Sequence, residues 1–95
     1  MKLNQEQIQT ALTELPSWRQ DGDKITQTIR FPNYLDGIRF ISKLAIQAEA
    51  VQHHPDLTIN WCNIKIDLNT HDVNGISQKD IDMAKYIESL LPEFL

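Results

Sequence analysis

The first apolar positions of the chain recur at helical spacing over residues 4–14. The apolar side of this segment consists of Ile8, Ala11 and Leu12. Asn4 is a typical N-cap residue, and Gln7 stands three positions later, where a capping box places Glu or Gln. Pro16 follows the pattern closely, which is typical of the end of a helix. The segment therefore predicts a short amphipathic helix.

A period of two replaces the helical period in the next part of the chain. Residues 18–20 predict a short strand, and the dipeptide Asp21-Gly22 is a strong turn signal. Residues 24–31 then alternate, with Ile25, Gln27, Ile29 and Phe31 on one side and Lys24, Thr26, Thr28 and Arg30 on the other. Gln27 interrupts the apolar row. The pattern predicts a half-buried antiparallel strand with one face toward water.

The longest helical pattern covers residues 34–52, after the candidate N-cap Asn33. Its apolar positions are Leu35, Ile38, Ile41, Leu44, Ala45, Ala48 and Val51. Pro55 disfavours the α conformation at His54 and has no amide hydrogen to donate. We therefore expect the helix to end close to His53 and His54.

Two further alternating segments, residues 57–62 and 64–70, predict adjacent strands joined near Asn63. Trp61 falls on the apolar side with Leu57 and Ile59, so we expect it in the core. A loop at residues 71–75 precedes a last helix that Ser77 opens, with Asp80 at the capping-box position. The inner face of that helix consists of Ile81, Ala84, Ile87 and Leu91.

The order helix, two strands, helix, two strands, helix predicts an α+β fold. Helices packed on one face of an antiparallel sheet are the usual arrangement for such an order. The chain has no internal repeat and no Gly/Pro/Ser-rich linker, and 95 residues are near the commonest size of one domain. We therefore expect a single domain over residues 1–95.

Composition and charge exclude several classes of function. The net charge of −4 and the scattered Lys and Arg residues argue against binding of nucleic acid, since a phosphate backbone needs a basic face. No segment has the length of a membrane span, and the first residues, M-K-L-N-Q-E-Q, lack the apolar run of a signal peptide. The single cysteine, Cys62, cannot form an internal disulfide. We expect a cytoplasmic protein that binds no membrane.

The chain places two of its three histidines, His53 and His54, side by side at the predicted helix end. Glu49 lies four residues before His53, on the same helical face. The third histidine, His71, stands just beyond the last predicted strand. Because helix ends and strand ends are where side chains converge, we expect the three imidazoles to surround one cleft. Histidine titrates near neutrality, so such a group can donate and accept protons together.

Other interpretations of the same residues stay open. Two adjacent histidines can be no more than a polar pair at a helix end. A metal ion held by His53, His54, His71 and Glu49 is a second alternative, although no zinc-type spacing is present. Asp80 can be a capping carboxylate only, and Trp18 can be hydrophobic cover only. No nucleophile is evident, since no serine stands in a nucleophile elbow and Cys62 lies within a strand pattern.

The spacing of these residues resembles the signature of the pterin-4a-carbinolamine dehydratases. The signature reads Glu49, three residues, His53-His54-Pro55, five residues, Trp61, nine residues, His71, eight residues, Asp80. The stretches I-R-F-P-N-Y-L-D-G-I-R-F, Q-A-E-A-V-Q-H-H-P-D, L-N-T-H and G-I-S-Q-K-D-I-D-M-A-K-Y-I are also similar to that family. Together these stretches extend over about residues 18–90.

The resemblance implies a four-stranded antiparallel sheet with three helices packed on one face. It implies dehydration of 4a-hydroxytetrahydropterin to quinonoid dihydropterin, a step that recycles the pterin used by aromatic amino-acid hydroxylases, with no metal and no bound cofactor. The active-site histidines of the family match His53, His54 and His71, and its substrate-binding positions match Glu49, Pro55, Thr70, Asp72 and Trp18. The family often has an acidic residue just before the histidine pair, where this chain has Gln52.

Loss of water from C4a requires one proton delivered to the departing hydroxyl and one proton removed from a ring nitrogen. We propose His54 as the general acid, and His53 and His71 as anchors for the pterin, one of them serving as base. Glu49 either orients His53 or binds donor nitrogens of the pterin.

The resemblance also leaves alternatives of other classes. Some members act as dimerisation cofactors of a transcription factor or as regulators, so the chain can work mainly by binding a protein partner. A role in another pterin pathway, such as molybdopterin-related metabolism, is a further alternative. The family forms homodimers and homotetramers through edge strands and helix packing, and a small domain with an exposed edge strand favours such pairing.

Overall fold

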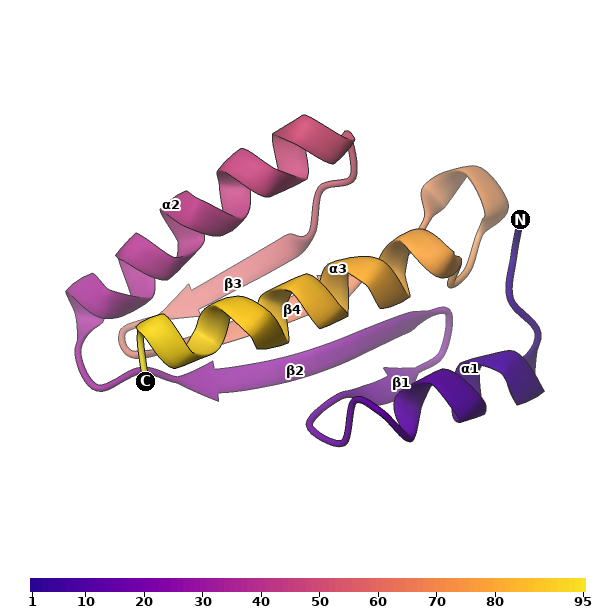
Figure 1. Cartoon of the computed structure of the whole chain (residues 1–95), viewed down its shortest axis with the longest axis horizontal. Coiled ribbons are helices and arrows are strands. Elements are labelled where there is room, and N and C mark those ends of the chain that lie inside the picture. The colour runs from indigo at the N-terminus through magenta and orange to yellow at the C-terminus, as the bar shows by residue number, and fades with distance from the viewer.

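Four antiparallel strands form one open sheet in the order β1-β2-β4-β3 (Figure 1). The structure, a computed structural model, describes all 95 residues. The strands are β1 (Arg19–Asp21), β2 (Lys24–Arg30), β3 (Asp56–Asn60) and β4 (Asn63–Leu68). The two central strands, β2 and β4, pair from Ile25–Leu68 to Arg30–Asn63. The outer pairs, β1–β2 and β3–β4, are hairpins. Because β3 pairs with β4 alone, β3 is a free edge of the sheet.

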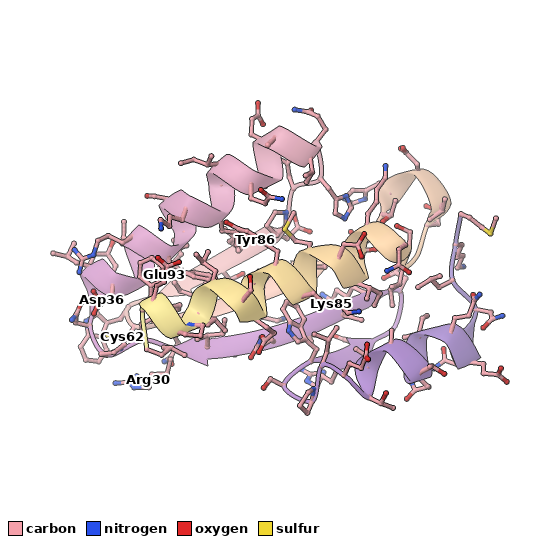
Figure 2. All side chains as sticks on the ribbon, viewed as in Figure 1. Arg30, Asp36, Cys62, Lys85, Tyr86 and Glu93 are labelled. Atoms are coloured by element: carbon pink, nitrogen blue, oxygen red, sulfur yellow. The ribbon has the colours of Figure 1, made fainter.

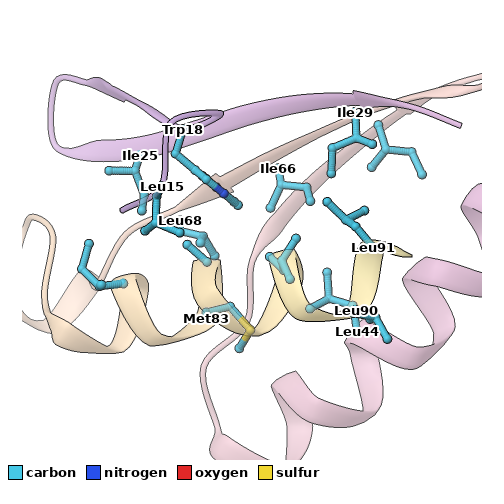
Figure 3. Packing of buried hydrophobic residues seen from close by; sticks show 14 of the residues in the cluster. Leu15, Trp18, Ile25, Ile29, Leu44, Ile66, Leu68, Met83, Leu90 and Leu91 are labelled. Carbon is cyan, nitrogen blue, oxygen red and sulfur yellow. The ribbon is translucent and has the colours of Figure 1, made fainter. Parts of the chain in front are cut away.

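Three helices complete the fold: α1 (Gln5–Leu12), α2 (Tyr34–Val51) and α3 (Gln78–Leu90). α2 and α3 lie on the same face of the sheet, and α1 lies beside β1 (Figures 1 and 3). Short 3-10 turns follow at His71–Val73 and Leu91–Glu93. The predicted fold class and the order α-β-β-α-β-β-α are confirmed.

The predicted helix starts are confirmed in their hydrogen bonds. Asn4 Oδ1 accepts from Gln7 N–H at 2.8 Å, and Gln7 Oε1 accepts from Asn4 N–H at 2.9 Å, so the capping box of α1 is complete. The side chain of Asn33 caps α2, and Ser77 with Asp80 forms the capping box of α3. These local bonds satisfy amides that have no partner within the helix.

One cluster of 19 buried apolar residues fills the space between the sheet and the helices (Figure 3). The strand β4 contributes Ile64, Ile66 and Leu68, which alternate with half-buried polar residues, as the period of two predicts. α3 contributes its predicted inner face, with Ile81, Ala84 and Ile87 at 2% exposure or less.

The inner face of α2 differs from the predicted one. The buried residues are Gly37, Phe40, Leu44 and Ala48, whereas Leu35 and Val51 are 59% and 49% exposed. Apolar side chains surround more than half of this helix, so periodicity alone did not fix which stripe faces the sheet. Gly37 marks the close approach, since a Cβ there would lie 3.0 Å from Ile64 Cδ1. The exposed remainder gives α2 a second apolar face.

Gln27, which interrupts the apolar row of β2, has a specific partner beneath the sheet. Its Nε2 donates to Glu88 Oε2 of α3 at 2.8 Å, and Trp18 Nε1 donates to the same oxygen at 3.0 Å. A polar side chain is tolerated in this layer because it is hydrogen-bonded. The bond also fixes Trp18, which is 4% exposed, within the core (Figure 3).

The expectation that Trp61 lies in the core is wrong. Trp61 and Cys62 form the two-residue loop between β3 and β4, and Trp61 is 66% exposed with a left-handed φ of 53°. The alternation therefore ends at Asn60, and the turn lies before Asn63 rather than at it. The Trp61 ring centroid lies 5.2 Å from the guanidinium carbon of Arg30, a cation–π contact at the surface.

One position of the face expected to be wet is also buried. Thr26 is 1% exposed, and its Oγ1 makes no hydrogen bond within the protein. Thr26 pairs with Arg19 on one side and with Asp67 on the other, so it lies in the middle of the sheet, flanked by strands on both sides. Long neighbouring side chains cover such a central position even on an open face.

We expect Ile66→Ala to lower the free energy of unfolding by about 2–5 kcal/mol, because it leaves a cavity in a fully buried layer. The control is Leu95→Ala at the end of the chain, where the side chain is 63% exposed, and its effect stays within about 0.5 kcal/mol. Urea unfolding of the two variants measures the difference. Equal effects at both positions would contradict the described core.

Candidate active site

The end of α2 determines where the two adjacent histidines lie. Gln52 adopts a left-handed conformation, with φ 52° and ψ 46°, and its N–H binds carbonyl oxygens of the last turn. His53 N–H donates to Ala48 O at 3.0 Å. The chain therefore leaves the helix one residue before His53, and Pro55 precedes β3. His53 and Glu49 do not share a helical face, in contrast to the expectation from their spacing.

His53 turns inward, toward the start of α3. Its Nε2 lies 2.6 Å from Oδ1 of Asp80. The side chains of His53 and Asp80 are 11% and 0% exposed, so the contact is shielded from water. A contact this short between an imidazole and a carboxylate is a strong, charge-assisted hydrogen bond.

Asp80 binds two further groups with its other oxygen. Oδ2 accepts from the Ser77 N–H at 2.9 Å and from Thr70 Oγ1 at 2.8 Å, and Thr70 Oγ1 lies 2.6 Å from Ser77 Oγ. A fully buried carboxylate requires such donors, since an unpaired one is costly to bury. We call these four residues, His53, Thr70, Ser77 and Asp80, the Asp80 network.

The network indicates which nitrogen of His53 carries hydrogen. The Ser77 amide and the Thr70 hydroxyl both donate to Oδ2, which leaves Oδ1 as the acceptor for Nε2–H. In the neutral ring, Nδ1 then carries the free lone pair. His53 is thus arranged to accept a proton at Nδ1.

His54 lies outside this network. Its Nε2 is 2.7 Å from Glu49 Oε1, and the two side chains are 57% and 73% exposed. Glu49 therefore orients His54 rather than His53, because the helix has already ended and the chain turns back over its last turn. An exposed pair of this kind adds little to stability. It leaves the His54 ring open to a ligand.

His71 begins the 3-10 turn directly after Thr70, and its exposed side chain makes no hydrogen bond within the protein. Through Thr70 and Asp80, the turn is joined to His53, which lies 27 residues before Asp80 in the chain. The structure thus connects the two histidine segments through one carboxylate.

The remaining predicted substrate-binding residues lie outside the Asp80 network. Pro55 is half-buried at the start of β3, and Asp72 is exposed beside His71. Trp18 lies in the core and is bonded to Glu88, eight residues along α3 from Asp80, which corresponds to about 12 Å of helix. The structure does not bring Trp18 to the Asp80 network.

Two cavities flank the Asp80 network. One, of about 130 Å³, lies between α2 and α3 and is lined by Gln47, Val51, His53, Lys79, Asp82, Met83 and Tyr86. Tyr86, labelled in Figure 2, belongs to the α3 side of this cavity. The other, of about 450 Å³, is lined by Met1, Leu3, Thr70, Asp72, Val73, Ser77, Gln78 and Lys79. Of the three histidines, only His53 lines either cavity, and Lys79 lines both. Neither cavity is therefore the expected cleft that all three imidazoles surround.

The role of Asp80 in joining His53 to Thr70 was not predicted from the sequence. Its capping role is confirmed, but that role uses only one of its two carboxylate oxygens. Its place in the motif spacing was the one available signal, because the contacts with His53 and Thr70 join residues far apart in the chain.

The structure contains no candidate for a metal site or for a membrane-spanning helix. No group of three or more His, Cys, Asp or Glu side chains is placed so that it could hold a metal ion. None of the helices combines the length and the apolar character that crossing a membrane requires.

The family model and the similar proteins indicate the same family. The family described as "Pterin 4 alpha carbinolamine dehydratase" matches residues 1–90. A relative from Thermosynechococcus vestitus, named "Putative pterin-4-alpha-carbinolamine dehydratase", is 46% identical over 94% of each chain. A relative of the same name from Natronomonas pharaonis is 42% identical over 94% of this chain and 95% of its own.

Two solved structures share the fold. A crystal structure described as a transcriptional coactivator/pterin dehydratase from Brucella melitensis superposes with a TM-score of 0.92 at 26% identity, over 95% of this chain and 98% of that one. A pterin dehydratase-like protein described as a RuBisCO assembly factor of the alpha-carboxysome superposes with a TM-score of 0.67 at 21% identity, over 78% and 88% of the two chains. The second likeness concerns the fold alone.

We expect Asp80→Asn to change the hydrogen position on the His53 ring. An amide has a single acceptor oxygen for the three donors of the network, so one of them loses its partner. Nitrogen-15 NMR of the histidine rings measures the change, and the free energy of unfolding falls by about 1–3 kcal/mol.

The matched control for this variant is Asp82→Asn, two residues further along α3, where the carboxylate is exposed and accepts only from Gln78 Nε2. Ring signals of His53 that remain those of the parent protein in Asp80→Asn would contradict the assignment.

Proposed function

Because the chain belongs to the pterin 4 alpha carbinolamine dehydratase family, we propose that it converts 4a-hydroxytetrahydropterin into quinonoid dihydropterin and water by acid–base catalysis with its histidines. The observation that carries this proposal is the buried bond between His53 and Asp80, at 2.6 Å. Two histidines that are only a polar pair at a helix end do not need a fully buried carboxylate bound to a ring nitrogen of one of them. An acid–base residue does, because its free nitrogen must be presented in a fixed direction.

The reaction needs two proton transfers and no redox partner. The bond between C4a and its hydroxyl oxygen breaks, and an acid supplies the proton that makes the leaving group water. A base removes the proton from the neighbouring ring nitrogen, and the electron pair of that N–H bond completes the new C=N double bond. Each positioned acid or base typically contributes about 10²- to 10⁴-fold to the rate.

We assign the base to His53 and the acid to His54. His53 Nε2 is bound to Asp80, so Nδ1 is the nitrogen that accepts the proton. His54 is exposed and its ring is oriented by Glu49, whose negative charge compensates a protonated imidazole. His71 lies at the loop joined to the network through Thr70, and we assign it to binding of the pterin together with Pro55, Thr70 and Asp72.

The proposal also includes the natural substrate, the metabolic role and the cellular location. We propose the tetrahydrobiopterin derivative as substrate, recycling of pterin for an aromatic amino-acid hydroxylase as the role, and the cytoplasm as the place. These finer assignments rest on the family resemblance.

We also propose that the chain forms homodimers or homotetramers. Three apolar side chains on α2 and on the edge strand β3 remain exposed, and we call them together the α2–β3 face: Leu35, Ile46 and Ile59, at 59%, 71% and 46% exposure. The edge strand β3 contains no Lys and no Pro, the residues that commonly block edge pairing. Exposed apolar patches of this kind mark association sites.

Binding of another protein is the second candidate function, and the α2–β3 face supports it too. One similar structure is described as a transcriptional coactivator as well as a pterin dehydratase. Dehydratase activity of the purified chain separates the two functions, because a pure binding module needs no oriented acid–base pair. A genome in which the gene lies beside a phenylalanine hydroxylase gene would favour the recycling role over another pterin pathway.

We expect His54→Ala to lower turnover by about 10²- to 10⁴-fold, because it removes the proposed acid, without lowering the stability of the fold. Stopped-flow kinetics with enzymatically generated 4a-hydroxytetrahydropterin measures turnover, with and without a chelator. The control is Gln9→Ala on α1, another exposed side chain remote in sequence from the histidines. Unchanged turnover of His54→Ala would remove the assignment, and loss of parent activity in the chelator would favour a metal.

We expect Ile59→Lys to shift the protein toward smaller species, because it places a charge on the free edge strand within the α2–β3 face. Sedimentation velocity measures the mass of parent and variant. Thr10→Lys on the exposed side of α1 is the matched control. A parent protein that is monomeric at micromolar concentration would end the proposal.

A further inference from the structure

The loop that carries His71 and Asp72 is held at its base rather than along its length. Thr70 N–H donates to Gly75 O at 2.7 Å, and Gly75 N–H donates to Thr70 O at 3.4 Å, which closes the loop. Within the loop, the bonds are those of a single 3-10 turn that ends at Asn74 in a left-handed conformation. The position of His71 therefore depends on what holds residues Thr70 and Gly75.

One side of this base is held by the Asp80 network, through Thr70. The other side is held by the first residues of the chain, which run beside this loop (Figure 1). Leu3 N–H donates to Ile76 O at 2.8 Å, and Lys2 forms an isolated antiparallel bridge with Ser77. This segment belongs to none of the four strands of the sheet.

Two side-chain contacts fix the segment in place. Leu3 packs against the apolar core, so the segment is anchored by burial as well as by its hydrogen bond. The Lys2 stem crosses Gly75 so closely that a Cβ there would lie 2.6 Å from Lys2 Cε. Met1 and Leu3 also line the cavity that contains Thr70, Asp72 and Ser77.

We propose that Leu3 is a positioning residue of the candidate active site. Its N–H and its side chain hold the second side of the base of the His71 loop, at Ile76, next to Ser77 of the Asp80 network. This inference rests on the proposed function for its effect on turnover, but its structural effect can be measured without it. Leu3 touches neither the proton donor nor the proton acceptor, so it acts through the loop.

The test compares Leu3→Pro with Gln5→Pro. Leu3→Pro removes the amide hydrogen that binds Ile76 O. Gln5 is the first residue of α1, where proline is tolerated and the N–H has no partner within the helix. We expect Leu3→Pro to speed hydrogen exchange at the Thr70 amide and leave that of Leu44 in α2 unchanged. We expect kcat/KM to fall roughly 10- to 100-fold, the effect of a misplacement near 1 Å. Gln5→Pro remains close to the parent protein in both measurements.

A double variant separates positioning from general destabilisation. In a His71→Ala background, Leu3→Pro lowers kcat/KM little further, because the loop it positions no longer carries the ring. Equal losses in both backgrounds, equal effects of Leu3→Pro and Gln5→Pro, or parent-like exchange at Thr70 would each overturn the proposal. Should Leu3→Pro not fold, Leu3→Ala removes the core anchor and is judged by the same measurements.

A parent protein without dehydratase activity would end the proposed function. In that case hydrogen exchange at Thr70 still decides whether Leu3 holds the loop, so the two failures are distinct.

Discussion

One buried carboxylate holds together the segments on which the candidate site depends. Asp80 binds the end of α2 through His53, the end of β4 through Thr70, and its own helix start through Ser77. The side chain has no exposure to water, so each of these bonds replaces a hydration contact that the carboxylate has lost. Removing any one partner leaves part of a buried charge unsatisfied. The position of the His53 ring is therefore tied to the start of α3.

A second carboxylate on the same helix serves the fold instead of the site. Glu88 accepts from Trp18 and Gln27, which join the start of β1 and the middle of β2 to the far part of α3. Polar groups thus hold α3 at both ends, and apolar side chains fill the space between them. This division explains why Trp18, although part of a stretch that resembles the family, lies in the core and not beside the histidines.

The sequence alone predicted the features that depend on residues close together in the chain. Helix caps such as Asn4 and the alternation of β4 were predicted correctly, because hydrogen bonds and side-chain directions over a few residues determine them. Predictions failed where the backbone leaves its regular course. Left-handed residues at Gln52 and Trp61 turned Glu49 toward another histidine and moved an indole to the surface. The several contacts of Asp80 were invisible because they join distant segments.

The central pair of strands has a consequence for the order in which the protein folds. β2 and β4 pair residues as far apart as Ile25 and Leu68, with all of α2 and the β3 strand between them. Closing that long loop is slow compared with forming the two hairpins, since chain entropy opposes contacts between distant residues. The Asp80 contacts, in contrast, join only residues 53–80, a shorter interval that includes no residue of β2. The Asp80 network therefore depends on the β3–β4 hairpin and the start of α3, and its assembly requires a shorter chain closure than completion of the sheet does.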